Sequence, residues 1–265
     1  SPFFYRAVVG IFLISIVSAI AGSLAVLKRS TYAVTGMAHS ALGGAAFGIL
    51  MRSIGLAFFT PLLGELIFGI ALAMFIGSIV SEIRDEKTDL IIGVSFALVM
   101  SLSVMLITSI REYASVVWGY IVGDVLLLTE NDILDLFVVT CIILFIVAIL
   151  FRHFVYVSFD ADSARALGIP VTFVINMLYI VIALSVVVSL KAIGSILVYV
   201  YMTLPPSIAN KMSKDAYNMV TYTFIIALVS GIIGLLVSMV LGISPSAITG
   251  MIIALLYTIA LIFKR

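Results

Sequence analysis

The chain has 265 residues, of which 64% are hydrophobic and only 10% are charged, and its net charge is +1. Soluble domains are closer to half apolar and a quarter charged, so this composition, with a mean hydropathy of +1.35, predicts an all-α polytopic membrane protein. No polar stretch approaches the size of a soluble catalytic domain, and the small net charge excludes the basic footprint of a nucleic-acid-binding protein. We therefore expect one transmembrane domain over residues 1–265. The single cysteine, Cys141, is expected to be an inert small apolar side chain.

Apolar runs of about twenty residues can cross a bilayer as helices. They predict eight or nine transmembrane segments, near residues 7–27, 37–51, 61–80, 90–110, 133–151, 171–190, 193–209, 220–241 and 246–263. The first run has no small-residue cleavage site, so we interpret it as a span and not as a signal peptide. The runs at 37–51 and 193–209 are each compatible with a full span or with a half-helix buried in protein.

The basic residues support nine spans. With residues 158–170 placed inside and the chain alternated across the membrane, ten of the fourteen basic residues lie inside. These ten are Lys28, Arg29, Arg84, Lys87, Arg152, Arg165, Lys211, Lys214, Lys264 and Arg265, and the other four are Arg6, Arg52, Arg111 and Lys191. The positive-inside rule then predicts a plasma-membrane protein with its N-terminus outside and its C-terminus in the cytoplasm.

A stripe of small residues marks the second run. Gly36, Ser40, Gly44 and Gly48 recur at every fourth position and allow another backbone to approach closely, either in a second copy of the chain or in a helix of the same chain. The same run contains His39, whose imidazole is a common ligand for transition metals. The alternative for His39 is a structural role.

Carboxylates provide two further candidates. Glu65 lies in a predicted span, where a charge is costly and points to a functional site unless the residue sits at the membrane interface. Asp124, Glu130, Asp132 and Asp135 cluster near the predicted outer mouth, where they are either a solvated loop or a funnel that concentrates a divalent cation. Oxygen ligands suit manganese or iron and can also serve zinc.

A polar island covers residues 158–170. Asp160 and Asp162 open it, an alanine-rich body follows, and Gly168 with Pro170 closes it. This pattern predicts a helix of at most two turns, and such a helix needs another surface to be stable. Ala164 and Gly168 are four residues apart, so we expect them to share an exposed face that docks closely against a partner. The alternative is an ordinary amphipathic loop.

Several motifs carry a family resemblance. They are Gly22–Arg29, Thr35–Gly44, Asp89–Phe96, Trp118–Leu126, Phe159–Gly168, Gly194–Leu197 and Leu204–Ala209. In this order, from about residue 15 to about residue 260, the chain resembles the permeases of metal-uptake ABC transporters, the ABC-3 type importers of zinc, manganese and iron, which are related to vitamin-B12 and siderophore permeases. The chain departs from the family at Thr35, where the family has an acid, and at Gly43, where it has a proline.

The resemblance implies a type II ABC importer fold and a subunit with no chemistry of its own. It also implies an ATP-hydrolysing ABC subunit, an extracytoplasmic metal-binding protein and a permease homodimer in membrane lipid, with a zinc or manganese ion as transported cargo and no covalently bound cofactor. Residues 158–170 are then the cytoplasmic coupling helix. Its ATPase-contacting residues would be Phe159, Asp160, Asp162, Ala164, Arg165, Leu167 and Gly168. The outer gate would contain Trp118, Gly119 and Gly123, and the metal-contacting residues would be His39, Glu65 and Asp124.

Two alternatives remain. A secondary transporter driven by an ion gradient would need several buried acids or histidines, whereas only His39 and Glu65 qualify. An ABC permease for a siderophore or cobalamin would keep the fold and change the cargo, which the histidine-containing motif argues against. The sequence contains no nucleotide-binding glycine-rich loop and no zinc-protease or serine-hydrolase motif, which disfavours an enzyme.

Overall fold

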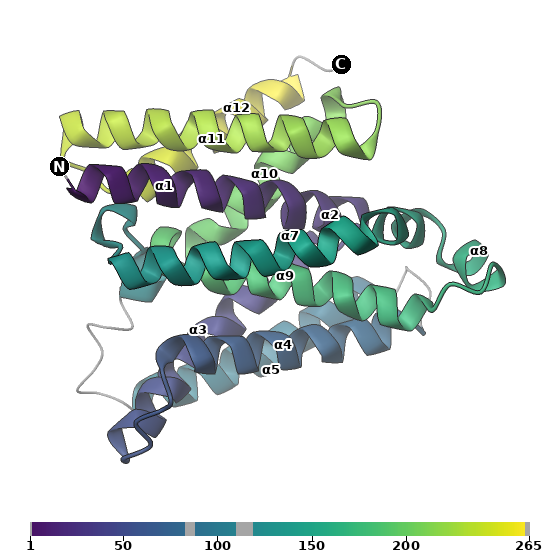
Figure 1. Ribbon diagram of the computed structural model, residues 1–265, viewed down its shortest axis with the longest axis horizontal. Coiled ribbons are helices and arrows are strands. Elements are labelled where there is room, and N and C mark those ends of the chain that lie inside the picture. The colour runs from purple at the N-terminus through teal and green to yellow at the C-terminus, as the bar shows by residue number, and fades with distance from the viewer. Residues whose placement is uncertain (1, 83–87, 110–118, 263–265) are drawn as a thin grey trace.

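The computed structural model describes residues 2–82, 88–109 and 119–262, and no strand occurs in that part of the chain (Figure 1). The helices are α1 (Pro2–Val17), η1 (Ser18–Gly22), α2 (Ser23–Leu27), α3 (Thr31–Ser53), α4 (Pro61–Val80), α5 (Thr88–Ser109), η4 (Val125–Leu127), α7 (Glu130–Phe159), α8 (Ala161–Ala166), α9 (Val171–Ile193), α10 (Ser195–Met212), α11 (Ala216–Leu241) and α12 (Pro245–Ile262). The predicted all-α membrane fold is confirmed.

Within the described residues, 8 helices are long and apolar enough to cross a membrane. The first of them, Phe3–Leu27, runs through α1, the π-helical turn η1 and α2 without a break. α10 adds a further passage. Its first turn follows Gly194, which packs on Gly123 at one end of the bundle, and its later turns pack on Gly22 toward the other end. The expectation of eight or nine spans is therefore met.

The two uncertain runs are both complete helices. α3 spans 23 residues, so the half-helix alternative for 37–51 is wrong; its small residues lower the hydropathy without shortening the helix. α10 continues through Pro205 and Pro206. A proline cannot donate to the carbonyl four residues earlier, and the carbonyl that Pro205 leaves free, that of Tyr201, instead accepts from Ser18 Oγ at 2.6 Å. Satisfaction by a neighbouring helix lets a buried helix tolerate proline.

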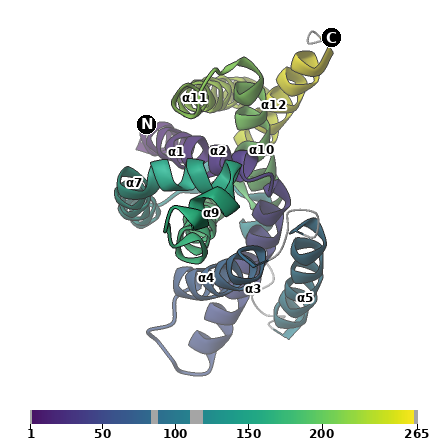
Figure 2. The same cartoon turned by 90° about the vertical axis from the view of Figure 1, so that its right-hand side faces the viewer.

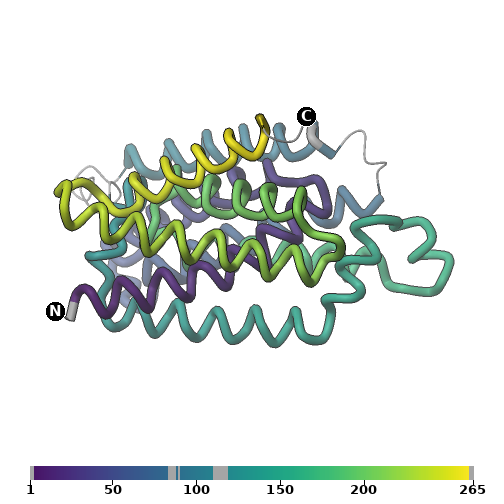
Figure 3. The backbone as a smooth tube through the Cα atoms, turned by 90° about the horizontal axis from the view of Figure 1, so that it is seen from above, coloured from purple at the N-terminus to yellow at the C-terminus, as the bar shows by residue number. Residues whose placement is uncertain are grey.

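The individual helices end at two opposite ends of the bundle. α8 protrudes at one end and α1 begins at the opposite end (Figures 1 and 3). Following the helices in chain order, Lys28, Arg29, Arg152, Arg165, Lys211 and Lys214 lie toward the α8 end, and Arg6, Arg52 and Lys191 lie toward the other. This is the predicted division. Arg84, Lys87, Arg111, Lys264 and Arg265 lie outside the described residues.

The small-residue stripe of α3 packs on α4 of the same chain. Gly44 and Gly64 lie so close that a Cβ on either would collide with the carbonyl of the other, and Ser40 Oγ donates to the Phe68 carbonyl at 2.9 Å. Of the two alternatives for the stripe, the contact within the chain is the one formed. It holds α3 and α4 in close contact.

The bundle has two different sides. In Figure 2, α5 and α12 lie on one side, and α7 lies on the opposite side with α1 between it and α11. The α1–α2 span is central: 78% of its apolar window is buried.

Candidate functional site

The three predicted metal-contacting residues are not brought together. His39 lines a cavity of ≈ 660 Å³ between α3, α5 and α10, and Glu65 lines a separate cavity of ≈ 470 Å³ between α4, α7 and α9. Asp124 lines neither of these two cavities.

The His39 cavity is apolar with a few hydroxyl groups. Thr35 lies one turn before His39 on the same wall, and Tyr199 and Ser195 come from α10. The His39 ring meets the Phe96 ring edge-on, with 5.4 Å between centroids. Ser103 Oγ donates to the His39 carbonyl at 2.8 Å and so ties α5 to α3 at this level.

The His39 ring packs against Phe96 and, among the described residues, has a ring nitrogen without a hydrogen bond. It is half-buried, and within the described chain its Nδ1 atom makes no hydrogen bond. Buried polar atoms are normally hydrogen-bonded, so this unsatisfied nitrogen calls for an explanation, and a bound ligand is one. The described lining of its cavity contains no carboxylate, and no group of three His, Cys, Asp or Glu side chains in the described residues could hold a metal ion. A metal at His39 needs ligands from elsewhere.

The second cavity is strongly polar. Glu65 is 2% exposed, and the Tyr120 hydroxyl lies near its carboxyl group in the same cavity. Burial, followed by the nearby Glu65 carboxylate, raises the pKa of Tyr120, so the phenol stays protonated. Asp132 and Asp135 line the same cavity. The predicted acidic group is thus partly formed, around Glu65.

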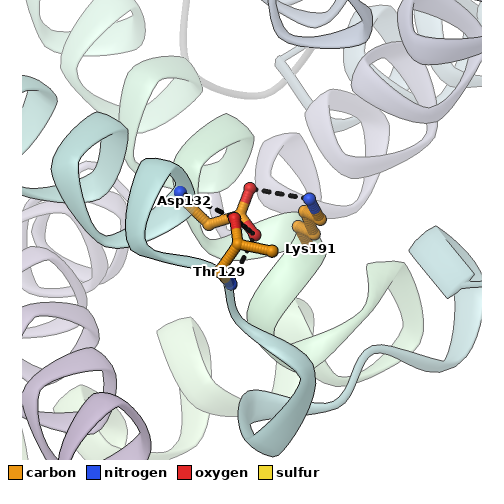
Figure 4. A network of polar contacts seen from close by, with 3 residues as sticks. All are labelled: Thr129, Asp132 and Lys191. Carbon is orange, nitrogen blue, oxygen red and sulfur yellow. Dashed lines mark hydrogen bonds and ion pairs between the residues drawn. The ribbon is translucent and has the colours of Figure 1, made fainter. Parts of the chain in front are cut away.

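Two cations lie among these carboxylates. Lys191 Nζ contacts Asp132 Oδ1 at 2.6 Å (Figure 4). Arg52 lines the cavity from α3. Asp132 also closes a capping box, accepting from the Thr129 backbone N–H at 2.8 Å and from Thr129 Oγ1 at 2.7 Å. It therefore caps α7 and joins it to α9. Sequence reasoning counted Lys191 only as an outer charge, and no local pattern links it to Asp132.

The predicted gate segment is tied to the α9–α10 break. Asp124 caps η4, its Oδ1 accepting from the Leu126 backbone N–H at 2.9 Å. Gly123 and Gly194 both have positive φ, 61° and 80°, and their backbones are packed together without room for side chains. Gly119 stands in the same segment, and Trp118 lies outside the described residues.

The polar island forms the expected short helix. Asp160 is its N-cap: Oδ1 accepts from the Ser163 backbone N–H at 2.9 Å, and the hydrogen bonds from Ser163 hold the pKa of Asp160 below its usual value. Gly168 ends it with a left-handed φ of 80°, as the sequence predicts.

The expected docking face is wrong in one respect. Ala164 is 0% exposed, because α8 turns this position toward α7 and α9. Arg165 is also engaged within the chain and donates from Nη2 to the Ser81 carbonyl at the end of α4, at 2.7 Å. Among the side chains that α8 and its flanks present outward are Phe159, Asp162 and Leu167.

Comparisons with known proteins agree over the full length. The model of the ABC 3 transport family matches residues 1–264. An uncharacterized membrane protein of Synechocystis sp. is 27% identical over 99% of this chain and 91% of its own. The "Manganese transport system membrane protein MntC" of Listeria monocytogenes is 28% identical over 98% of this chain and 90% of its own.

A solved structure shares the fold. "PsaBC from Streptococcus pneumoniae in complex with Fab" superposes with a TM-score of 0.83 at 20% identity, covering 97% of this chain and 90% of that chain. With a family model that spans nearly every residue and a matching helical architecture, this chain belongs to the ABC 3 transport family.

Proposed function

We propose that the chain is the permease subunit of an ATP-driven importer for a divalent transition-metal ion, manganese or zinc. Family membership supports the transport role, and the manganese name of a relative aligned over 98% of this chain supports the cargo class. The observation that carries the site is His39, an imidazole without a hydrogen bond at Nδ1 on the wall of a membrane-level cavity. Imidazole binds both metals, so the geometry and the types of the other ligands decide which metal the site prefers.

The proposal requires a second permease copy. One imidazole does not hold a metal, and the described residues of one chain offer no group of three ligands. A two-fold partner on the α5–α12 side would place a second His39 cavity opposite the first. Isologous pairs are the commonest oligomers. We therefore propose a homodimer, with the ion path along its two-fold axis.

Orientation and partners follow from the two ends of the bundle. The α8 end has most of the described basic residues and is assigned to the cytoplasm, so the N-terminus lies outside and the C-terminus inside. Phe159, Asp162 and Leu167 would contact the ATPase there, with Asp160, Ala164, Arg165 and Gly168 shaping the helix. The metal-binding protein would deliver the ion at the opposite end, near Asp124, Gly119, Gly123 and the Glu65 cavity. Thiol labelling from each side of the membrane, at introduced cysteines in a Cys141→Ser background, checks the orientation.

Uptake by the reconstituted complex tests the function. Permease, ATPase and metal-binding protein are placed in proteoliposomes, and ATP-dependent uptake of manganese, zinc and iron is measured. His39→Ala should lower uptake by at least about tenfold. Loss of a residue that only supports a metal ligand already lowers metal affinity or activity about tenfold, and His39 is proposed to contact the metal directly. His153→Ala is the matched control, because the other histidine is exposed on α7.

Two outcomes contradict the proposal. Uptake at the unmutated rate in His39→Ala would return His39 to a structural role. Uptake that persists without ATP and follows an imposed ion gradient would favour the secondary-transporter alternative.

A further inference from the structure

An apolar groove runs along the side of the bundle between α7 and α11. Its volume is ≈ 610 Å³. α1 and η1 pack against α11, and α1 and α2 pack against α7, so the α1–α2 span forms the floor between the two walls (Figure 2). Ile20, Leu144, Val147, Ala148 and Val220 line it.

One end of the groove is polar and positively charged. Arg152 lines it together with Tyr217 and Thr221. Arg152 is exposed, and no carboxylate occurs among the described lining residues. The Tyr217 ring packs against the Phe151 ring at a tilt, with 4.9 Å between ring centroids. These residues lie toward the α8 end, since Arg152 is in the last part of α7 and Tyr217 is at the start of α11.

The surface around the groove is apolar and exposed. Phe145 and Ile149 on α7 and Ile225 on α11 are among the exposed large apolar side chains. The apolar windows of α7 and α11 are only 28% and 33% buried. A water-exposed face of this kind would be unstable, so in a membrane it is covered by acyl chains. The groove is also on the side opposite α5 and α12, where the proposed second copy would sit (Figure 2).

We propose that this groove binds one anionic phospholipid from the leaflet on the α8 side. An acyl chain lies over Ile20 between Val147 and Val220. The phosphate is held by the Arg152 guanidinium, with the Tyr217 hydroxyl as a neighbouring donor. A guanidinium pairs strongly with phosphate oxygens, and one basic side chain near a membrane surface gives about a fivefold preference for anionic lipid. This site is independent of the transported ion and of the ATPase.

Lipid retention by the purified full-length permease tests the proposal. The protein is delipidated in detergent, mixed with equal amounts of phosphatidylglycerol and phosphatidylcholine of identical acyl chains, and examined by native mass spectrometry. We expect one retained lipid per chain, with phosphatidylglycerol favoured about fivefold. Arg152→Ala should reduce this preference to near unity. Lys214→Ala, which removes an exposed cation outside the groove at the same end, should leave it unchanged.

A second pair of variants tests the apolar part. Ala148 is exposed in the groove wall, so Ala148→Phe should fill the groove and lower retention of both lipids several-fold. Val138→Phe, on an exposed position of α7 outside the groove, should retain lipid as the unmutated chain does. Helix content by circular dichroism confirms that each variant is folded.

Three results would overturn the inference. The first is equal retention of the two lipids by the unmutated chain. The second is unchanged preference in Arg152→Ala combined with unchanged retention in Ala148→Phe. The third is a change from dimer to monomer in either variant, which would identify the groove as a contact between copies.

Discussion

Glu65 offers a test at the scale of single residues, because its cavity holds three carboxylates and two cations. Glu65, Asp132 and Asp135 face Arg52 and Lys191, which leaves one excess negative charge when Glu65 is ionised. A net negative charge raises the local concentration of cations, here at the end of the bundle opposite α8, where the ion would be delivered. At a pH where Glu65 is ionised, Glu65→Gln should therefore raise the KM for metal uptake about threefold or more while kcat changes less than about twofold.

Glu130→Gln is the matched control for this measurement. Glu130 is an exposed acid near the same end that does not line the cavity, so its KM should not move. An unchanged KM in Glu65→Gln would assign Glu65 a structural role beside Tyr120 and remove it from the ion path.

The candidate residues were predictable by type and not by arrangement. A histidine and a glutamate inside apolar runs are visible in the sequence because each is costly there. Tyr120 and Lys191 were not singled out, since a tyrosine before a span and a lysine at the end of one are unremarkable until the fold brings them to Glu65 and Asp132. The same lack of spatial information grouped His39 with Glu65, which the structure places in separate cavities.

At the scale of elements, α8 is fixed to its own subunit on one side and open on the other. Leu167 is 71% exposed, so it is the apolar contact that an ATPase cleft would bury. Leu167→Asp should abolish co-purification of the ATPase and metal-stimulated ATP hydrolysis, since burying an unpaired charge is costly. Permease yield should be unchanged, because the side chain has little contact with its own chain.

Leu127→Asp is the control for this substitution, with a leucine of 74% exposure in η4 at the other end of the bundle. It should bind the ATPase normally. Normal co-purification and turnover in Leu167→Asp would mean that α8 is an ordinary loop helix.

The limits of α8 could be predicted, and its orientation could not. Asp160 and Gly168 act through bonds within the segment itself, a cap and a left-handed turn, so their residue types are sufficient signals. The burial of Ala164 depends on α7 and α9, and the position of Arg165 depends on the Ser81 carbonyl of a distant helix. Likewise, the two prolines of α10 do not reveal that Ser18 packs beside them. Its hydroxyl donates to the Tyr201 carbonyl, which Pro205 leaves without a donor.

At the scale of the whole molecule, the number of crossings and their alternation were predictable because lipid imposes both. A span must be a long helix with its backbone bonds satisfied internally, and charges mark the ends. α10 was the hard case, since it has 18 residues but is not among the described helices that hydropathy identifies as candidate spans. Hydropathy does not tell which apolar face of a helix meets lipid and which meets protein, because both faces are built from the same types of side chain.

The proposed homodimer can be tested by distinguishing these two faces. Ile196 is 63% exposed beside the His39 cavity, and Phe145 is 68% exposed on α7 on the far side. In a Cys141→Ser background, Ile196→Cys should react with a membrane-permeant maleimide several-fold more slowly than Phe145→Cys, since only the first is covered by a partner. Light scattering of the purified permease should give about twice the 28.5 kDa chain mass. A monomeric mass, or equal labelling rates, would contradict the dimer on this side. Slow labelling of Phe145→Cys would instead place the partner on the α7–α11 face and displace the proposed phospholipid.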